Sequence, residues 1–222
     1  MVRPPGRGGN VSYTAAVTTR VTGLTGATIV RAPSVCQTCV WWQTRRKDED
    51  KADWIAEAED RWGSWGALYH DDDGRVLGTM QFGPAELFPR ARELPAGPAS
   101  DDAVLVTCAY LVDRHSPWVI QSLFLTAIGE ARDRGAAALE AFAYRYPEGE
   151  SARERFQVHK TVFPRDFLSD FGFETVRAQG RVELVRLELG GLAPVAEGSR
   201  ARVIEIVKEA FQPDVAPVPQ RP

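Results

Sequence analysis

Cysteine is scarce in this sequence: the 222 residues include only three. An odd and small number of cysteines does not make the disulfide framework of a secreted mini-protein. Long apolar runs are also missing, because charged residues interrupt each one well short of the roughly 20 residues that a membrane-spanning helix needs. The N-terminal MVRPPGRGGN is not followed by an apolar stretch with a cleavage site, so no secretory signal is expected. These absences favour a cytoplasmic protein with no membrane partner.

The sequence also lacks a strong charge of either sign. Its net charge is −3 and its isoelectric point is about 5.7. The basic run Thr44–Lys47 is too short to outweigh this balance, so a nucleic-acid partner is not expected. The hydrophobic content of 44% and charged content of 26% are ordinary for a globular protein.

The length supports one good-sized domain with appendages. Residues 1–10 are rich in Pro, Gly and Arg, which predicts a disordered N-terminus. Residues 11–191 are expected to form the folded domain. Residues 192–222 are expected to form a C-terminal extension, with a helix over Arg200–Phe211 before a Pro-rich tail. The apolar stripe of that helix could support a homodimer.

The most informative segment lies in the middle of the chain. Val104–Val112 is an apolar, β-branched-rich run typical of a buried strand. Trp118–Gly135 has the apolar spacing of a helix with one buried face, ended by its glycine. Ala137–Arg145 reads as a second buried strand, so a β-α-β unit with parallel strands is predicted. Because ligands of α/β sheets bind where strands end and helices begin, Leu111–Ile120 is the first candidate site.

Further elements are predicted on both sides of this unit. A strand is expected around Ala27–Arg31, a helix over Asp48–Trp62, and a hairpin turning at Asp73-Gly74. Gly83–Asp102 reads as a long Pro-rich loop that could cover a substrate site, with Glu86 and Phe88 placed for contact, or be a surface excursion. Near the C-terminus we expect a Phe-rich short helix and an antiparallel pair, formed by Phe173–Arg177 and Arg181–Leu189.

Two local sequences resemble a known family. FLSDFGFETVR (Phe167–Arg177) is similar to the aromatic-rich helix and Gly-Phe pair of the GCN5-related N-acetyltransferase (GNAT) superfamily. EARDRGAAALEAFA (Glu130–Ala143) is similar to the end of that family's cofactor helix and the strand after it. The resemblance covers roughly Ala27–Leu189. It implies an α/β fold, with a mixed, mostly antiparallel sheet and a central β-α-β unit flanked by helices.

The resemblance also implies acetyl-CoA as co-substrate. The family binds the pyrophosphate at a helix N-terminus through a Q/R-x-x-G-x-G/A loop, which here falls near His115–Ile120. Trp118 and Ile120 occupy the glycine positions, and Pro117 removes a donor. Arg114 and His115 could supply charge and Ser116 a helix cap, or these residues could serve only as solvated charge and cap. The expected cofactor-binding residues are Leu111, Val112, Arg114, His115, Ser116, Trp118, Val119, Ile120 and Gln121.

Catalysis in the family needs a base for the amine, a donor for the oxyanion and an acid for the thiolate. The family's tyrosine position corresponds to Leu168, which cannot donate a proton. Glu140 is a candidate base, or else a carboxylate paired with an arginine. Tyr144 is a candidate acid at the end of its strand. His159 suits proton transfer near neutral pH, or is a surface histidine.

Cys36-Gln-Thr-Cys39, followed by Val, Trp41 and Trp42, is the most unusual local sequence. A Cys-x-x-Cys pair can be structural, can supply half of a zinc site, or can act as a redox dithiol. No second such pair exists, so no metal is assigned. The two tryptophans could line an acceptor pocket or pack on the core.

The sequence therefore predicts transfer of an acetyl group from acetyl-CoA to the amine of a small molecule or peptide, by direct attack. The alternative is a non-catalytic GNAT-fold module that binds a ligand or partner, with the Cys-x-x-Cys pair as a metal site.

Overall fold

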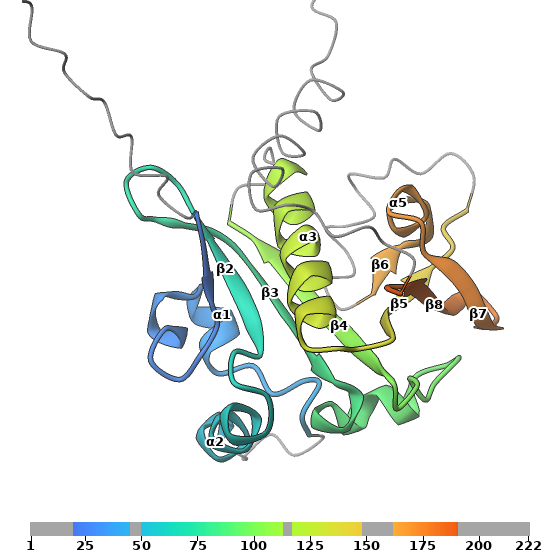
Figure 1. Ribbon diagram of the computed structural model, residues 1–222, viewed down its shortest axis with the longest axis horizontal. Coiled ribbons are helices and arrows are strands. Elements are labelled where there is room, and N and C mark those ends of the chain that lie inside the picture. The colour runs from blue at the N-terminus through green and yellow to red at the C-terminus, as the bar shows by residue number, and fades with distance from the viewer. Residues whose placement is uncertain (1–19, 45–49, 113–116, 148–161, 191–222) are drawn as a thin grey trace, which may run out of the picture.

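An eight-stranded sheet organises the protein (Figure 1). The computed structural model describes residues 20–44, 50–112, 117–147 and 162–190. The strands run in the order β1-β2-β3-β4-β5-β8-β7, with β6 paired to β5. Their bounds are β1 Val21–Gly23, β2 Gly66–His70, β3 Val76–Pro84, β4 Ala103–Leu111, β5 Ala138–Tyr144, β6 Phe163–Pro164, β7 Glu174–Gln179 and β8 Val182–Glu188.

Most neighbouring strands are antiparallel, and the parallel pairs are β4 with β5 and β5 with β6. The helices are α1 Ser34–Gln37, α2 Lys51–Trp62, α3 Pro117–Asp133 and α5 Arg165–Asp170. The predicted fold class, a mixed and mostly antiparallel sheet around a central β-α-β unit, is confirmed. The predicted termini at residues 1–10 and 192–222 lie outside the described residues.

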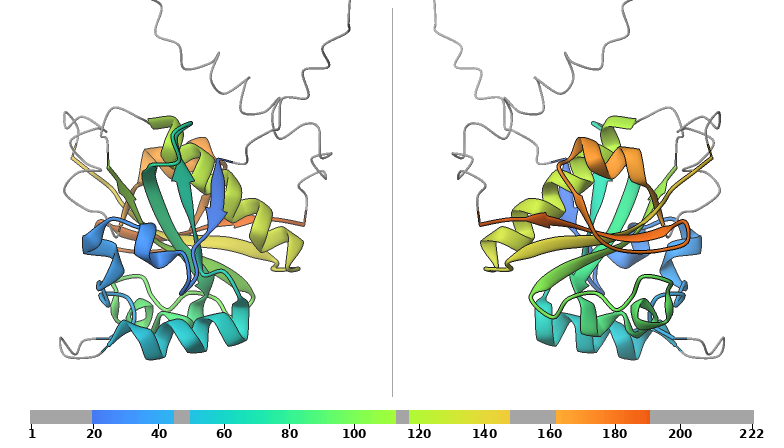
Figure 2. Two further views of the ribbon diagram at one scale, coloured as in Figure 1. Left: turned by 90° about the vertical axis from the view of Figure 1, so that its left-hand side faces the viewer. Right: turned by 90° about the vertical axis from the view of Figure 1, so that its right-hand side faces the viewer.

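The helix α3 lies on one face of the sheet, and the segments of α1 and α2 lie on the other (Figure 2). Each face has its own hydrophobic core. On the first face, which we call the α3 face, α3 and the Phe-rich segment around α5 pack on the strands. On the second, the α2 face, residues of α2 and of the segments on either side of it pack on the opposite side chains. Since neighbouring side chains of a strand point to opposite faces, each central strand contributes to both cores.

The β4-α3-β5 unit forms as its sequence predicts. The apolar stripe of α3 is fully buried on the α3 face at Val119, Leu123, Ala127 and Ala131. Gly135 follows the helix with a positive φ of 76°, a conformation that glycine adopts without strain. The crossover therefore returns β5 beside β4 in parallel.

The predicted strand around Ala27–Arg31 is wrong. Residues Ile29–Arg31 form a 3-10 helix, and the strand is β1, which pairs with β2. The reason is local hydrogen bonding. Thr28 donates from its hydroxyl to the Gly23 carbonyl at 2.8 Å and accepts from the Thr25 amide at 2.8 Å, and these bonds close a turn.

The segment predicted as a long loop is largely structured. β3 extends to Pro84, and two 3-10 helices follow, Ala85–Leu87 and Pro89–Glu93. Phe88 is fully buried against Trp54, with ring centroids 5.8 Å apart. It therefore belongs to the core, and its expected place as a substrate contact is wrong.

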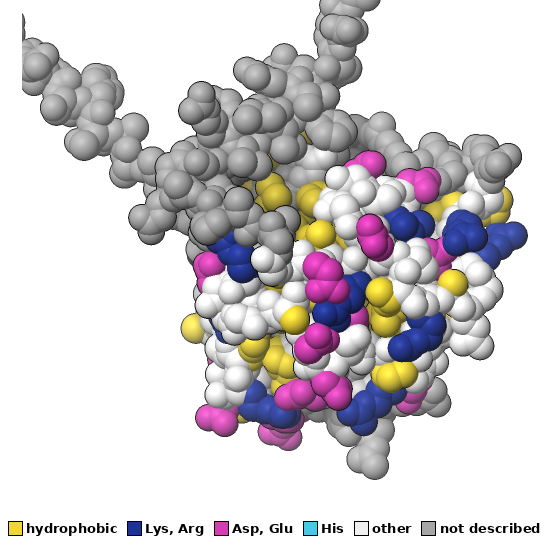
Figure 3. Space-filling view, turned by 45° about the vertical axis from the view of Figure 1, so that its right-hand side comes forward, with side chains coloured by type: hydrophobic (Ala, Val, Ile, Leu, Met, Phe, Trp, Pro, Cys, Tyr) yellow, Lys and Arg dark blue, Asp and Glu magenta, His cyan; other side chains and the backbone are white. Residues whose placement is uncertain are grey.

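No helix within the described ranges has both the length and the apolar character needed to cross a membrane. On the face shown in Figure 3, basic and acidic side chains of the described residues are interspersed, and neither sign forms one continuous patch.

Candidate functional site

The parallel strands β4 and β5 separate part-way along their length. They pair from Ala103 with Ala138 to Val106 with Ala141, and beyond that no strand among the described residues pairs with this edge of β4. The end of β5 instead pairs with β6, through Ala143 and Tyr144. We call this region the β4–β5 splay: residues 107–111 of β4 and 142–144 of β5. It leads directly towards the N-terminus of α3.

A β-bulge marks the point where β4 leaves β5. The register of β3 against β4 shifts from Phe82–Val106 to Gln81–Cys108, so Thr107 is an additional residue in β4. The buried Thr107 hydroxyl donates to the Gln81 carbonyl at 3.1 Å. Gln81 in turn accepts from the Gln43 side-chain amide at 3.2 Å. These buried hydrogen bonds stabilise the bulge and with it the direction of the last residues of β4.

Backbone groups of β4 face the splay at alternate residues. The Val112 amide donates to the Leu77 carbonyl at 2.9 Å, which directs this residue towards β3. By the alternation of an antiparallel ladder, Leu111 and Ala109 then direct their amides and carbonyls towards β5. Leu111, a predicted cofactor-binding residue, therefore directs its backbone groups towards the splay, whereas the Val112 amide already donates to Leu77. Ala109 was not predicted, since neither the bulge nor the splay can be read from sequence.

The N-terminus of α3 follows the end of β4. The cofactor-binding residues predicted there differ in the exposure of their side chains. Trp118 is exposed, and Gln121 is partly buried. The side chains of Val119 and Ile120 are buried, so only their backbone amides could reach a ligand. A helix leaves its first amides without an intrahelical acceptor, which suits an anion. The predicted Arg114, His115 and Ser116 lie outside the described residues.

Two tyrosines border the splay on the α2 face. Cys108 and Phe142 pack in the core of that face, and the residues two further along, Tyr110 and Tyr144, point the same way. The Tyr144 ring lies 4.9 Å from that of Tyr146, in an edge-to-face arrangement. Tyr144, the predicted acid, thus lies at the end of β5, beside the splay. His159 lies outside the described residues.

Glu140 is held by hydrogen bonds away from the splay. It lies in the paired part of β5 and is fully buried. Its carboxylate accepts from the Ser100 amide at 2.8 Å, from the Ser100 hydroxyl at 2.7 Å and from Arg186 at 3.2 Å. This geometry favours the second interpretation of the sequence, a carboxylate paired with an arginine, over a base in contact with substrate.

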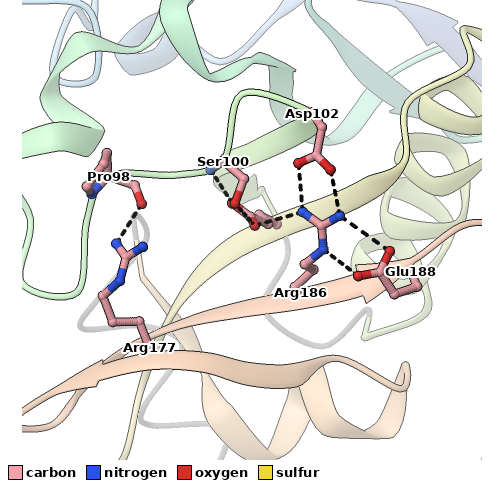
Figure 4. Close-up of polar contacts among 7 residues, drawn as sticks. Pro98, Ser100, Asp102, Arg177, Arg186 and Glu188 are labelled. Atoms are coloured by element: carbon pink, nitrogen blue, oxygen red, sulfur yellow. Dashed lines mark hydrogen bonds and ion pairs between the residues drawn. The ribbon is translucent and has the colours of Figure 1, made fainter.

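Arg186 connects Glu140 to two further carboxylates. Its guanidinium donates to both oxygens of Asp102, at 2.9 and 3.0 Å, and to Glu188 at 2.6 Å (Figure 4). The hydrogen bond from Arg186 holds the pKa of Asp102 below its ordinary value. The neighbouring Arg177 donates to the Pro98 carbonyl at 2.9 Å. These hydrogen bonds therefore hold residues 96–102 against β5, β7 and β8.

Leu168 is fully buried in the core of the α3 face, so its side chain is a packing residue. Within the described ranges, no group of three or more His, Cys, Asp or Glu side chains is arranged to hold a metal ion.

No protein-family model matches the sequence, and no curated protein sequence matches it. Similarity is found among solved structures. Solved structures that it resembles include acetyltransferases of the GNAT family. One, from Desulfovibrio desulfuricans, is 15% identical with a TM-score of 0.46, and the match covers 77% of this chain and 98% of that one.

Two others were solved with a ligand. YncA from Salmonella typhimurium, with its cofactor acetyl-CoA, is 17% identical with a TM-score of 0.45, covering 80% of this chain and 97% of that one. A GNAT-family acetyltransferase from Brucella melitensis, in complex with acetyl-CoA, is 12% identical with a TM-score of 0.43, covering 78% and 90%. At these similarities, the functional proposal has to rest on the geometry of this chain.

Proposed function

We propose that this protein is an N-acyltransferase that moves an acetyl group from acetyl-CoA to the amine of a small molecule or peptide. The observation that carries the proposal is the β4–β5 splay, where Ala109 and Leu111 turn their backbone groups to an edge of β4 that pairs with no strand of the described residues, close to the first turn of α3. An extended chain carrying amide groups can add to such an edge as a further strand. The pantetheine arm of CoA is a chain of this kind.

The residues of the splay suit the two parts of CoA separately. Leu111 would exchange backbone hydrogen bonds with the pantetheine amides, and the Ala109 carbonyl would accept one more. The amides of Trp118, Val119 and Ile120, at the positive end of α3, would meet the pyrophosphate. The predicted Arg114, His115 and Ser116 would complete this phosphate site from the segment before α3.

The chemistry requires few groups. In direct attack, the amine nitrogen forms a bond to the thioester carbon, and the C–S bond breaks after an oxyanion has formed. The Ala109 amide is our proposed donor to that oxyanion, since it faces the splay beside the bulge. Tyr144 is our proposed general acid, which would protonate the departing thiolate. His159 remains our proposed candidate for receiving the amine's proton. Glu140 has no proposed contact with substrate, because its oxygens already accept three hydrogen bonds.

A thiol-release assay tests the proposal. Purified protein is incubated with acetyl-CoA and a panel of small amines and peptides, and free CoA is measured against acetyl-CoA with no amine. The proposal expects release that depends on at least one amine and is lost in Ala109→Pro, which removes the amide. Tight acetyl-CoA binding without release for any amine would support the non-catalytic module instead.

A further inference from the structure

The three cysteines of the sequence meet around one buried lysine on the α2 face. Cys36 lies in α1, Cys39 follows it, and Cys108 lies next to the bulge in β4. Lys51, at the start of α2, donates from Nζ to the Cys36 carbonyl at 2.6 Å. The same Nζ lies 5.2 Å from the centre of the Trp65 ring. Acetyl transfer uses none of these groups, so the cluster calls for a separate explanation.

Cys36 and Cys39 have the backbone arrangement that a disulfide requires. The Cys36 amide donates to the Pro33 carbonyl at 2.7 Å, and Thr38 remains in the right-handed helical region, with φ −110° and ψ −3°. Residues three apart in a helical turn have Cα atoms about 5 Å apart, from the radius and rise of the helix. This separation lies inside the range of roughly 4.4–6.8 Å found in disulfides. Both cysteines are in the thiol form in the structure.

The three thiols lie in different surroundings. Burial, followed by the charges of Cys36 and Cys39, raises the pKa of Cys108 to about 12. Cys108 therefore stays protonated at neutral pH and does not attack. Cys39, by contrast, is exposed and reachable by a reagent in solution.

We propose that Cys36 and Cys39 are a redox-active dithiol that forms a reversible intramolecular disulfide by exchange with a small-molecule disulfide such as oxidised glutathione. The thiolate of Cys39 attacks one glutathione sulfur, and one reduced glutathione leaves. Cys36 then attacks the mixed disulfide at the Cys39 sulfur, and the second glutathione leaves. The two protein thiols lose two electrons and two protons, which the two glutathione molecules gain.

The chain is anchored in the core immediately after this turn. The segment after Cys39 is anchored by Trp42, which is buried with its ring centroid 6.0 Å from that of Phe142. Trp41 is covered by the Arg90 guanidinium, 4.0 Å from the ring centre. Closure of the disulfide therefore concerns the α1 turn alone, and it is independent of the proposed acetyl transfer.

Equilibration of the full chain in mixtures of reduced and oxidised glutathione tests the proposal. Free thiols are then alkylated, and intact mass and peptide mapping identify the linkage. We expect monomeric chains that have lost two hydrogen atoms, a Cys36–Cys39 linkage, and full reversal by dithiothreitol. Cys108→Ser should retain the linkage with the same midpoint, whereas Cys36→Ser and Cys39→Ser should each lose it.

Three results would overturn the proposal. The first is that both thiols remain open to alkylation in the most oxidising mixture. The second is that the linkage joins two chains, and the third is that it includes Cys108. Circular dichroism of each variant shows whether a lost linkage reflects a lost fold. Because Cys108→Ser leaves both members of the pair in place, it keeps the test decisive if one of the other variants is unstable.

Discussion

Tyr110 and Tyr144 lie on the two strands that border the β4–β5 splay and point to the same face of the sheet. This symmetry provides a matched pair of variants. General acid catalysis typically contributes about 10²–10⁴-fold to a rate. Under the proposed role of Tyr144, Tyr144→Phe should lower kcat by roughly 10²-fold and leave the Kd for acetyl-CoA unchanged.

Tyr110→Phe is the control for this prediction, since it removes the same hydroxyl from the facing strand. We expect kcat within about threefold of the original for Tyr110→Phe, a change too small for the loss of a general acid. Equal losses in the two variants, measured by CoA release at saturating acetyl-CoA, would rule out Tyr144 as the specific acid.

Glu140 shows why the chemistry of a residue type is a weak guide to its role. The sequence places a carboxylate in a core strand, but the arginine and serine that pair with it come from distant segments. Glu140→Gln leaves Arg186 with one fewer charged partner, so the free energy of unfolding should fall by about 1–3 kcal/mol. Urea unfolding measures this value.

The control for that measurement is Glu188→Gln, because Glu188 also accepts from Arg186 but its side chain is 69% exposed. Exposed ion pairs contribute about 0–1 kcal/mol, so we expect little change. A loss in Glu188→Gln as large as that in Glu140→Gln would show that burial does not decide the contribution of this network.

At the scale of elements, the start of α3 depends on a glycine in β3. A Cβ added at Gly78 would lie 2.7 Å from Val119 Cγ1 and 3.1 Å from Leu111 Cδ2, so the first turn of α3 or the end of β4 would have to move. Both belong to the proposed CoA site. Gly78→Ala should therefore weaken acetyl-CoA binding by about tenfold, equivalent to 1.4 kcal/mol.

Gly83→Ala is the matched change in the same strand, where the nearest atom would lie 3.5 Å away. Its affinity should equal that of the original protein in calorimetric titration. If Gly78→Ala also binds normally while remaining folded, the position of the first turn of α3 does not control binding.

The elements could be predicted where one local signal dominates. The apolar run of β4, the periodic stripe of α3 and the Asp73-Gly74 turn each specify their structure within a few neighbouring residues. The segment Ala27–Arg31 could not be predicted, because threonine side chains compete with strand pairing for the backbone groups of its turn. The region around Phe88 could not be predicted either, since its order depends on packing against α2.

At the scale of the whole molecule, a buried carboxylate makes stability depend on pH. Glu183 is fully buried and accepts from Thr175 at 2.6 Å, from Arg165 at 3.2 Å and from Arg145. Burial alone would raise the pKa of Glu183, but the Thr175 hydrogen bond and the arginines outweigh it and hold that pKa below its ordinary value of 4.5. This stabilisation is therefore present above pH 4.5 and lost as the pH falls through the pKa of the folded state.

Thr175→Val tests this linkage, because it removes one hydrogen bond to the ionised carboxylate. The variant should be less stable than the original at neutral pH, and the difference should shrink at acidic pH as Glu183 becomes protonated. Thr126→Val is the control: Thr126 donates to the Ser122 carbonyl, which does not titrate, so its effect should not vary with pH. Thermal unfolding across the acidic range distinguishes the two. A difference for Thr175→Val that stays constant with pH would contradict the account.

The arrangement of the whole sheet explains what sequence could and could not establish about the site. The order of the elements predicted from sequence indicates a mixed sheet around a central β-α-β unit. That order also places the expected site between β4 and α3. The sequence does not show that the amide of Ala109, and not that of Val112, faces the splay. This direction depends on the bulge at Thr107 and on strand register, which arise from pairing between distant segments. For the same reason, the partners of Glu140 and the meeting of three cysteines at Lys51 became visible only in the folded chain.

The central claim is that the β4–β5 splay and the start of α3 form a CoA site. Calorimetric titration with acetyl-CoA, with CoA and desulfo-CoA as comparators, tests it most directly. We expect micromolar binding of all three, and binding reduced at least tenfold by Ala109→Pro in a variant that remains folded. An absence of binding at millimolar acetyl-CoA, or equal binding by folded Ala109→Pro, would contradict it.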